Sequence, residues 1–191
     1  METRFRSRLH PVARTTLAGT AVGTAYGATL RGWMRLITDD PSFTWGGSGY
    51  VVGVFAVLGT SAGLATAGRN AGWVARLLVV RAVGIVLGLG CFVAAGAAML
   101  PTILPAATGL ARTDWPRWLR RALVGVGVLT CAAFLVERAL QDPGTRQVVG
   151  LAVYPALCAV EVAITARLYA PTLRRGALLR RRATSGRLTA A

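Results

Sequence analysis

Residues 148–168 read VVGLAVYPALCAVEVAITARL, an apolar run with only two charged side chains, Glu161 and Arg167. A helix needs about 20 predominantly apolar residues to cross the hydrocarbon layer of a membrane. Apolar runs of this length are rare in soluble proteins, where helices alternate polar and apolar faces. The stretch therefore predicts a membrane-embedded helix.

Four further apolar segments precede this one in the chain. They cover approximately residues 16–37, 49–67, 82–104 and 122–136 with its flanks. Segment 82–104 is the most hydrophobic and is expected to be continuous, whereas 16–37 is dominated by small residues. We predict an all-α fold, a polytopic transmembrane helix bundle with five membrane-embedded segments, of which four or five cross.

Composition argues against a soluble domain. Apolar residues make up 54% of the 191-residue chain and charged residues only 15%, below the quarter that is usual for soluble proteins. The net charge of +15 comes from 22 arginines, which gather between the apolar segments and in the tail. Beyond Tyr169 the tail has no aromatic residue on which a base could stack, so we expect no nucleic-acid partner.

The charge pattern divides the chain into three parts. Residues 1–14 form a basic arm, 15–170 the membrane-embedded bundle, and 171–191 an arginine-rich tail. Cations next to a membrane segment favour the cytoplasmic side, so we predict a multi-pass protein of the bacterial cytoplasmic membrane with a cytoplasmic C-terminus. The expected membrane-surface residues contact anionic lipids or anchor a helix at the interface: Arg174, Arg175, Arg180, Arg181, Arg182, Trp115 and Trp118.

The arginines do not agree with five simple crossings. With the tail inside, five crossings leave 13 arginines inside and 9 outside. If segment 16–37 does not cross, the counts become 17 and 5; if 82–104 is re-entrant, broken at Pro101 and Pro105, they become 18 and 4. The length and hydrophobicity of 82–104 argue against a break there, and the side of the N-terminus stays open.

Several glycines recur at a spacing of four, which places them on one helix face. The longest stripe is Gly19, Gly23 and Gly27, and Arg31 and Arg35 continue it. Small residues let helices approach closely in lipid, and we favour packing within the chain over an oligomer interface. The other helix-packing candidates are Gly49 with Gly53, Gly59 with Gly63, and Gly84 with Gly88.

Glu161 is the main candidate for an intramembrane polar site. An acid at this depth costs several kcal/mol unless it is paired, protonated or facing a wet cavity. Tyr154 and Thr165 fall on the same helix face. We favour a structural ion pair with an embedded arginine, Arg81 or Arg31, over a site that handles protons or cations.

Catalytic and metal-binding sets are missing from the sequence. The only histidine, His10, lies in the arm, so Ser–His and His–Asp arrangements are excluded from the core. The three cysteines each lie in a different apolar segment, and no lysine is present for a phosphate-binding loop. We therefore predict no enzymatic activity, no cofactor and no metal.

The stretch 33–47, WMRLITDDPSFTWGG, leads into a glycine-rich apolar segment. It resembles a group of uncharacterised small membrane proteins of GC-rich bacteria. The runs MLP at 99–101 and WPRW at 115–118 fit the same pattern, so the similarity covers about the first two-thirds of the chain. The resemblance implies a membrane location and an ordered loop between the first two segments, and it carries no activity.

Two functions remain open. The first is a non-enzymatic subunit that packs with a second copy or a membrane partner protein and anchors its tail on the inner leaflet. The alternative is a small transporter or channel-like protein that uses Glu161 with an embedded arginine.

Overall fold

The computed structural model describes residues 2–38, 44–72, 74–95, 99–141 and 143–171. These ranges hold six helices and no strand, which confirms the all-helical prediction. The helices are α1 (Glu2–Ile37), α2 (Trp45–Ala71), α3 (Val74–Ala95), α4 (Leu100–Ala111), α5 (Arg117–Ala139) and α6 (Thr145–Tyr169). By length and composition α2, α5 and α6 could each cross a membrane, and Leu77–Val86 and Leu100–Ala111 are shorter apolar stretches.

The expectation of one continuous segment over residues 82–104 is wrong. Helix α3 ends at Ala95, and α4 begins at Leu100 with Pro101 in its first turn. Proline suits a first turn because it has no N–H to leave unpaired there. The run is therefore two helices, although its hydrophobicity does not change at the break.

The predicted arm is not structurally separate from the first segment. Helix α1 runs without interruption from Glu2 to Ile37 and includes Pro11. The next two helices are joined by a glycine turn, because Gly72 ends α2 with a positive φ of 76° and its N–H bonds the Arg69 carbonyl. This left-handed conformation favours glycine, which has no Cβ.

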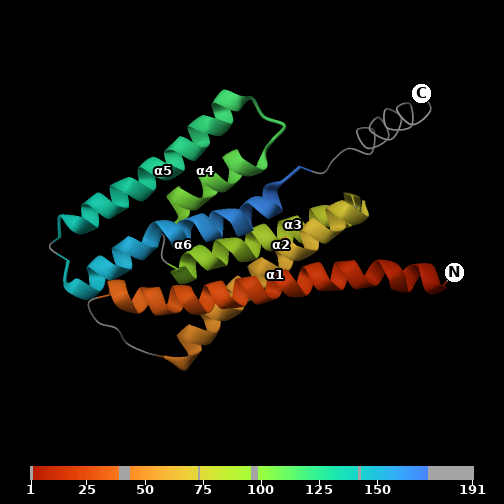
Figure 1. Cartoon of the computed structure of the whole chain (residues 1–191), viewed down its shortest axis with the longest axis horizontal. Coiled ribbons are helices and arrows are strands. Elements are labelled where there is room, and N and C mark those ends of the chain that lie inside the picture. Colours follow the sequence, from red (N-terminus) through yellow and green to blue (C-terminus); the bar gives the residue numbers. More distant parts are fainter. Residues whose placement is uncertain (1, 39–43, 73, 96–98, 142, 172–191) are drawn as a thin grey trace, which may run out of the picture.

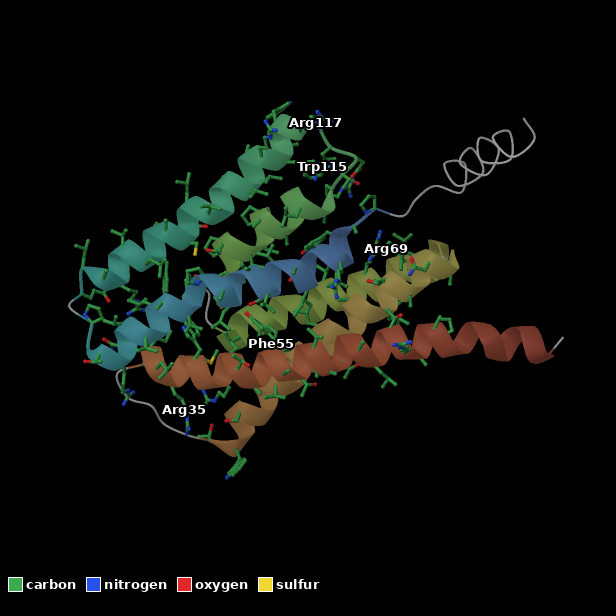
Figure 2. All side chains as sticks on the ribbon, viewed as in Figure 1. Arg35, Phe55, Arg69, Trp115 and Arg117 are labelled. Atoms are coloured by element: carbon green, nitrogen blue, oxygen red, sulfur yellow. The ribbon has the colours of Figure 1, made fainter. Side chains whose placement is uncertain are left out.

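Successive helices alternate in direction (Figure 1), so the start of α1 and the end of α6 lie at the same end of the bundle. We name this the terminal end; it also holds the α2–α3 and α4–α5 connections. Contacts agree with these directions, since Arg69 near the end of α2 donates to the Arg167 carbonyl near the end of α6. Figure 2 shows Arg69 and Arg117 toward the terminal end and Arg35 at the opposite end.

Arginines gather at the terminal end. Of the sixteen arginines in the described ranges, twelve lie toward this end of their helices and four toward the opposite end. The four are Arg31, Arg35, Arg138 and Arg146. The other six belong to residues 172–191, outside the described residues. Among the described arginines the division is therefore twelve to four.

The core forms around α6, which contacts α1, α2 and α4. Its largest fully buried side chains include Leu30 of α1, Phe55 of α2, Ile103 of α4 and Tyr154 of α6. Helix α5 packs mainly on α4, and Gly127 is its only buried residue. The described bundle thus has a well-covered centre, with α5 as an apolar helix at its periphery.

The glycine stripe of α1 lies against α2. A Cβ on Gly23 would collide with the Phe55 carbonyl and lie 3.0 Å from the Gly59 Cα. Gly19 meets Gly63 in the same way, with 3.0 Å from its added Cβ to the Gly63 Cα. The two backbones therefore approach closely along this line, as small residues allow.

The remaining glycine candidates differ in their surroundings. Gly27 contacts Phe55, and Gly84 of α3 lies against Ser61 and Leu168. Gly49 and Gly53 face open space, with no atom within 4 Å of an added Cβ, so they do not pack within the described chain. The surroundings of Gly88 lie outside what the structure describes.

Candidate functional site

The predicted polar residues of α6 share one buried face. Glu161 and Tyr154 are both 0% exposed, and Cys158 and Thr165 are buried with them. Their spacing of three or four residues places them in adjacent turns on the side that faces α1 and α4. The helical pattern that predicted this face could not identify the groups on the neighbouring helices.

Tyr26 of α1 is the polar partner of Glu161. Its hydroxyl lies 2.8 Å from Glu161 Oε2 and 3.1 Å from the Leu157 carbonyl oxygen. A hydroxyl has one proton to donate, so these two acceptors share it. Glu161 Oε1 has no hydrogen-bond partner among the described residues. The carboxyl group is thus held on one side and unsatisfied on the other.

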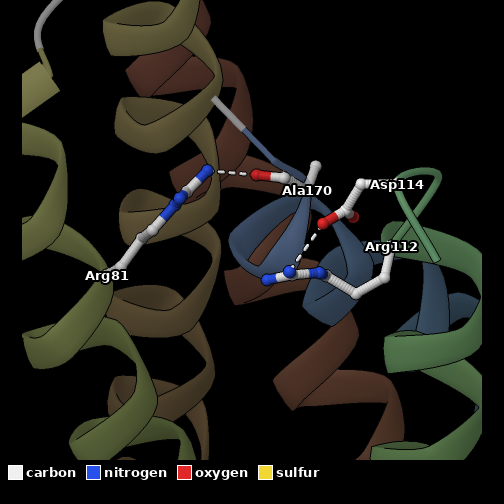
Figure 3. A network of polar contacts seen from close by, with 4 residues as sticks. All are labelled: Arg81, Arg112, Asp114 and Ala170. Atoms are coloured by element: carbon white, nitrogen blue, oxygen red, sulfur yellow. Dashed lines mark hydrogen bonds and ion pairs between the residues drawn. The ribbon is translucent and has the colours of Figure 1, made fainter. Parts of the chain in front are cut away.

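The structure does not bring Arg81 or Arg31 to Glu161. Arg81 donates to the Ala170 carbonyl at the terminal end (Figure 3), and Arg31 Nε donates to Ser48 Oγ at 3.1 Å near the start of α2. Throughout the described ranges no ion pair joins Glu161 to an arginine. The predicted structural ion pair is therefore wrong, because both arginines extend toward helix ends as long cations do in lipid.

An aromatic cluster lies beside this face. The Tyr154 ring stacks on Trp33 of α1, with centroids 5.5 Å apart, and contacts Phe134 of α5 at 4.5 Å. Trp33 Nε1 donates to the Gly150 carbonyl at 2.8 Å. The Tyr154 hydroxyl has no hydrogen-bond partner in the described structure. The cluster joins three helices, and it leaves a second buried polar atom unsatisfied on the face of Glu161.

Arginines cap the end of α6. Arg69 of α2 and Arg81 of α3 donate to the carbonyls of Arg167 and Ala170. The last carbonyls of a helix lack partners within the helix, and cations are favourable beside them. Nearby, Arg112 pairs with Asp114 at 2.7 Å (Figure 3). Three helices are thus tied together at the terminal end through backbone oxygens.

The expected membrane-surface residues are described only in part. Arg112 lies over the Trp115 ring, 5.0 Å from its centroid, and Trp118 is 71% exposed. Trp115 and Arg117 lie at the terminal end beside the start of α5 (Figure 2). Residues 172–191, which contain the five predicted tail arginines, lie outside the described residues, as do residues 39–43 of the expected loop.

In the described part of the chain, no three histidine, cysteine, aspartate or glutamate side chains lie together as a metal site would require. Cys131 and Cys158 are free thiols. No family model, curated protein or solved structure matches the chain. Three features of the chain bear on its function: the buried face of α6, the arginines of the terminal end and the exposed α5.

Proposed function

We propose that the chain is a multi-pass protein of the bacterial cytoplasmic membrane with a non-catalytic, structural role, and that α5 packs against a second copy or a membrane partner protein. The supporting observation is the exposure of α5. Only 6% of its apolar span is buried, against 56% for α2 and 44% for α6. Its outward side chains include Val126, Leu129 and Val136, a face broad enough for another helix.

The proposed topology has four crossings and one re-entrant hairpin. The crossings are α1, α2, α5 and α6, and the hairpin is α3 with α4. The 12 residues of α4 rise about 18 Å, short of the roughly 30 Å hydrocarbon layer. The α4 start lies inset from the opposite-end termini of α5 and α6 (Figure 1), and Met99 before it is fully buried.

The arginine distribution supports a cytoplasmic terminal end. Positively charged connections favour the cytoplasm, and the terminal end has twelve of the sixteen described arginines. The tail follows α6 at this end and is proposed to lie on anionic lipids of the inner leaflet. Both termini would then be cytoplasmic, which accounts for the even number of crossings.

Crosslinking in native membranes tests the interaction role. Leu129 of α5 and Leu17 of α1 are matched positions, with exposures of 69% and 67%. In a background without native cysteines, L129C is expected to give a dimer or a discrete adduct with another membrane protein, whereas L17C is not. Monomer alone from both variants would count against the interaction role.

A second candidate function is proton or cation transport through Glu161. The observation in its favour is the pair of unsatisfied buried atoms, Glu161 Oε1 and the Tyr154 hydroxyl, on one face of α6. Buried polar groups without partners are rare unless they have a role or bind water. In liposomes, flux that falls in Glu161→Gln would support transport, and equal background flux in both proteins would exclude it.

A further inference from the structure

A groove of about 770 Å³ runs between α4 and α5 at the terminal end. Its volume lies within the roughly 300–1,000 Å³ of known ligand sites. Along the apolar part the lining side chains are Leu110, Val124, Val128 and Leu129. At one end the lining changes to arginine. The groove therefore offers an amphiphilic surface, apolar along most of its length and cationic at one end.

Two glycines have opposite roles in shaping the groove. Gly109 of α4 lies close to α5, since its added Cβ would be 2.7 Å from the Arg120 carbonyl oxygen. Gly125 has no atom within 4 Å of an added Cβ and lines the hollow. The close contact at Gly109 holds the helices together, and the missing side chain at Gly125 leaves space beside it.

Three arginines form the cationic end, and one of them already has a bond. Arg120 Nε donates to the Gly109 carbonyl at 3.1 Å across the two helices. Arg117 and Arg121 are exposed and lie four residues apart, on one face of α5. The lining includes no acidic residue, and the nearby Asp114 is bonded to Arg112. The cationic charge of this end is therefore not neutralised by the groove itself.

We propose that this groove binds one anionic phospholipid of the leaflet at the terminal end, with its phosphate on Arg117 and Arg121 and an acyl chain along Val124, Gly125 and Val128. Charge complementarity selects the headgroup, because one guanidinium group can donate two parallel hydrogen bonds to two phosphate oxygens. The apolar lining selects a lipid over a free phosphate ester. The exposed Trp118 in the first turn of α5 places these arginines at headgroup level. The site is separate from the tail and goes beyond the proposed interaction role.

Lipid titration of the full chain tests the site. The protein is purified in a neutral detergent and titrated with phosphatidylglycerol or with phosphatidylcholine of the same acyl chains, and native mass spectrometry counts the bound lipid. We expect phosphatidylglycerol to bind at least about tenfold more tightly. The double variant Arg117→Gln/Arg121→Gln, which lacks both groove charges, should lose about this tenfold preference for phosphatidylglycerol. Arg120 is left unchanged because it also joins the two helices.

Two matched controls separate the groove from general electrostatics and packing. Arg14→Gln/Arg138→Gln removes the same charge from exposed positions away from the groove and should change the preference less than about threefold. Gly125→Leu should weaken the binding of both lipids because its side chain fills the hollow. Gly53→Leu, at an equally open glycine of α2, should leave lipid binding unchanged. The tail arginines are present in every variant, so their contribution cancels.

Three results would overturn the proposal. The first is an equal loss of the preference for phosphatidylglycerol in both double arginine variants, which would indicate diffuse electrostatic attraction. The second is displacement of the lipid by glycerol phosphate alone, which would indicate a phosphate site without an acyl groove. The third is absence of any preference in the wild type. If Gly125→Leu does not fold, the comparison of the two double arginine variants still tests the proposal.

Discussion

At the scale of single residues, the bond between Tyr26 and Glu161 is the buried contact between two side chains that joins α1 to α6. Both side chains are buried, and no cation shares the carboxylate in the described structure. Removing one partner of a buried hydrogen bond leaves the other unsatisfied, which costs more than the bond itself contributes. The contact should therefore matter more to stability than its 2.8 Å length alone indicates.

Replacing Tyr26 with phenylalanine should lower the free energy of unfolding by about 1–3 kcal/mol, because Glu161 Oε2 loses its donor. The measurement is thermal or denaturant unfolding in detergent. Tyr50→Phe is the control, since Tyr50 is 53% exposed. Equal stability of Y26F and wild type would show that the bond contributes nothing, and a double-mutant cycle with Glu161→Gln would isolate the coupling.

Sequence patterns located Glu161 and its face but not its partner. Helical spacing alone places Tyr154, Cys158 and Thr165 beside it, because that relation is internal to one helix. The choice of partner depends on which helix lies opposite and in which direction it runs. Tyr26 carried a weak signal, as a tyrosine next to Gly27, the last glycine of the α1 stripe. Arginine was the expected partner on charge alone, and geometry excluded it.

At the scale of elements, α1 and α2 pair through backbone proximity. Gly23→Ala should destabilise the protein by about 1–3 kcal/mol, since its methyl group would meet the Phe55 carbonyl and the Gly59 Cα and cannot be accommodated without separating the helices. Thermal unfolding in detergent measures the effect. Gly53→Ala, on an open face of α2, should be neutral or slightly stabilising, and a similar loss in both variants would contradict the close packing.

The break between α3 and α4 marks what hydrophobicity cannot predict. Residues 82–104 are apolar throughout, so a hydropathy scan has no boundary to detect. Pro101 was the available signal for a helix start, because proline is common in the first turn of a helix as well as at kinks. The structure uses it as a helix start, directly after the fully buried Met99.

At the scale of the whole molecule, the re-entrant hairpin predicts a pattern of thiol accessibility. In a background without native cysteines, Met99→Cys should not react with membrane-impermeant thiol reagents from either side, since Met99 is 0% exposed. Leu140→Cys, at a position that is 82% exposed at the opposite end, should react from the periplasmic side. Labelling of residue 99 from the periplasm would contradict the re-entrant hairpin and indicate six full crossings.

Reporter fusions provide an independent check of the same topology. Fusions at both termini and in the α4–α5 connection should report the cytoplasm, and fusions in the α1–α2 and α5–α6 connections should report the periplasm. The arginine pattern predicts this arrangement because each cation favours the cytoplasmic side. A periplasmic N-terminus would contradict it and restore an odd number of crossings.

Charge counting was more informative about the whole molecule than the count of apolar segments. Arginine totals favoured an even number of crossings, and the alternating helices place the start of α1 and the end of α6 at one end. The arginine count could not distinguish a first segment that does not cross from a third segment that is broken, because both give an even number of crossings. That choice depends on packing around α6, which no local pattern contains.

The central place of α6 has a consequence for biogenesis. Of the described helices, α6 is the last to leave the ribosome, yet α1, α2 and α4 all pack on it. Until it is synthesised, Tyr26 and Trp33 have no partner from residues 145–169. Helices α1 and α2 can pair before that point, as can α4 and α5, but the contacts that join these pairs through α6 form only afterwards. A chain whose translation stops before Thr145 would therefore be a substrate for insertion chaperones and membrane proteases.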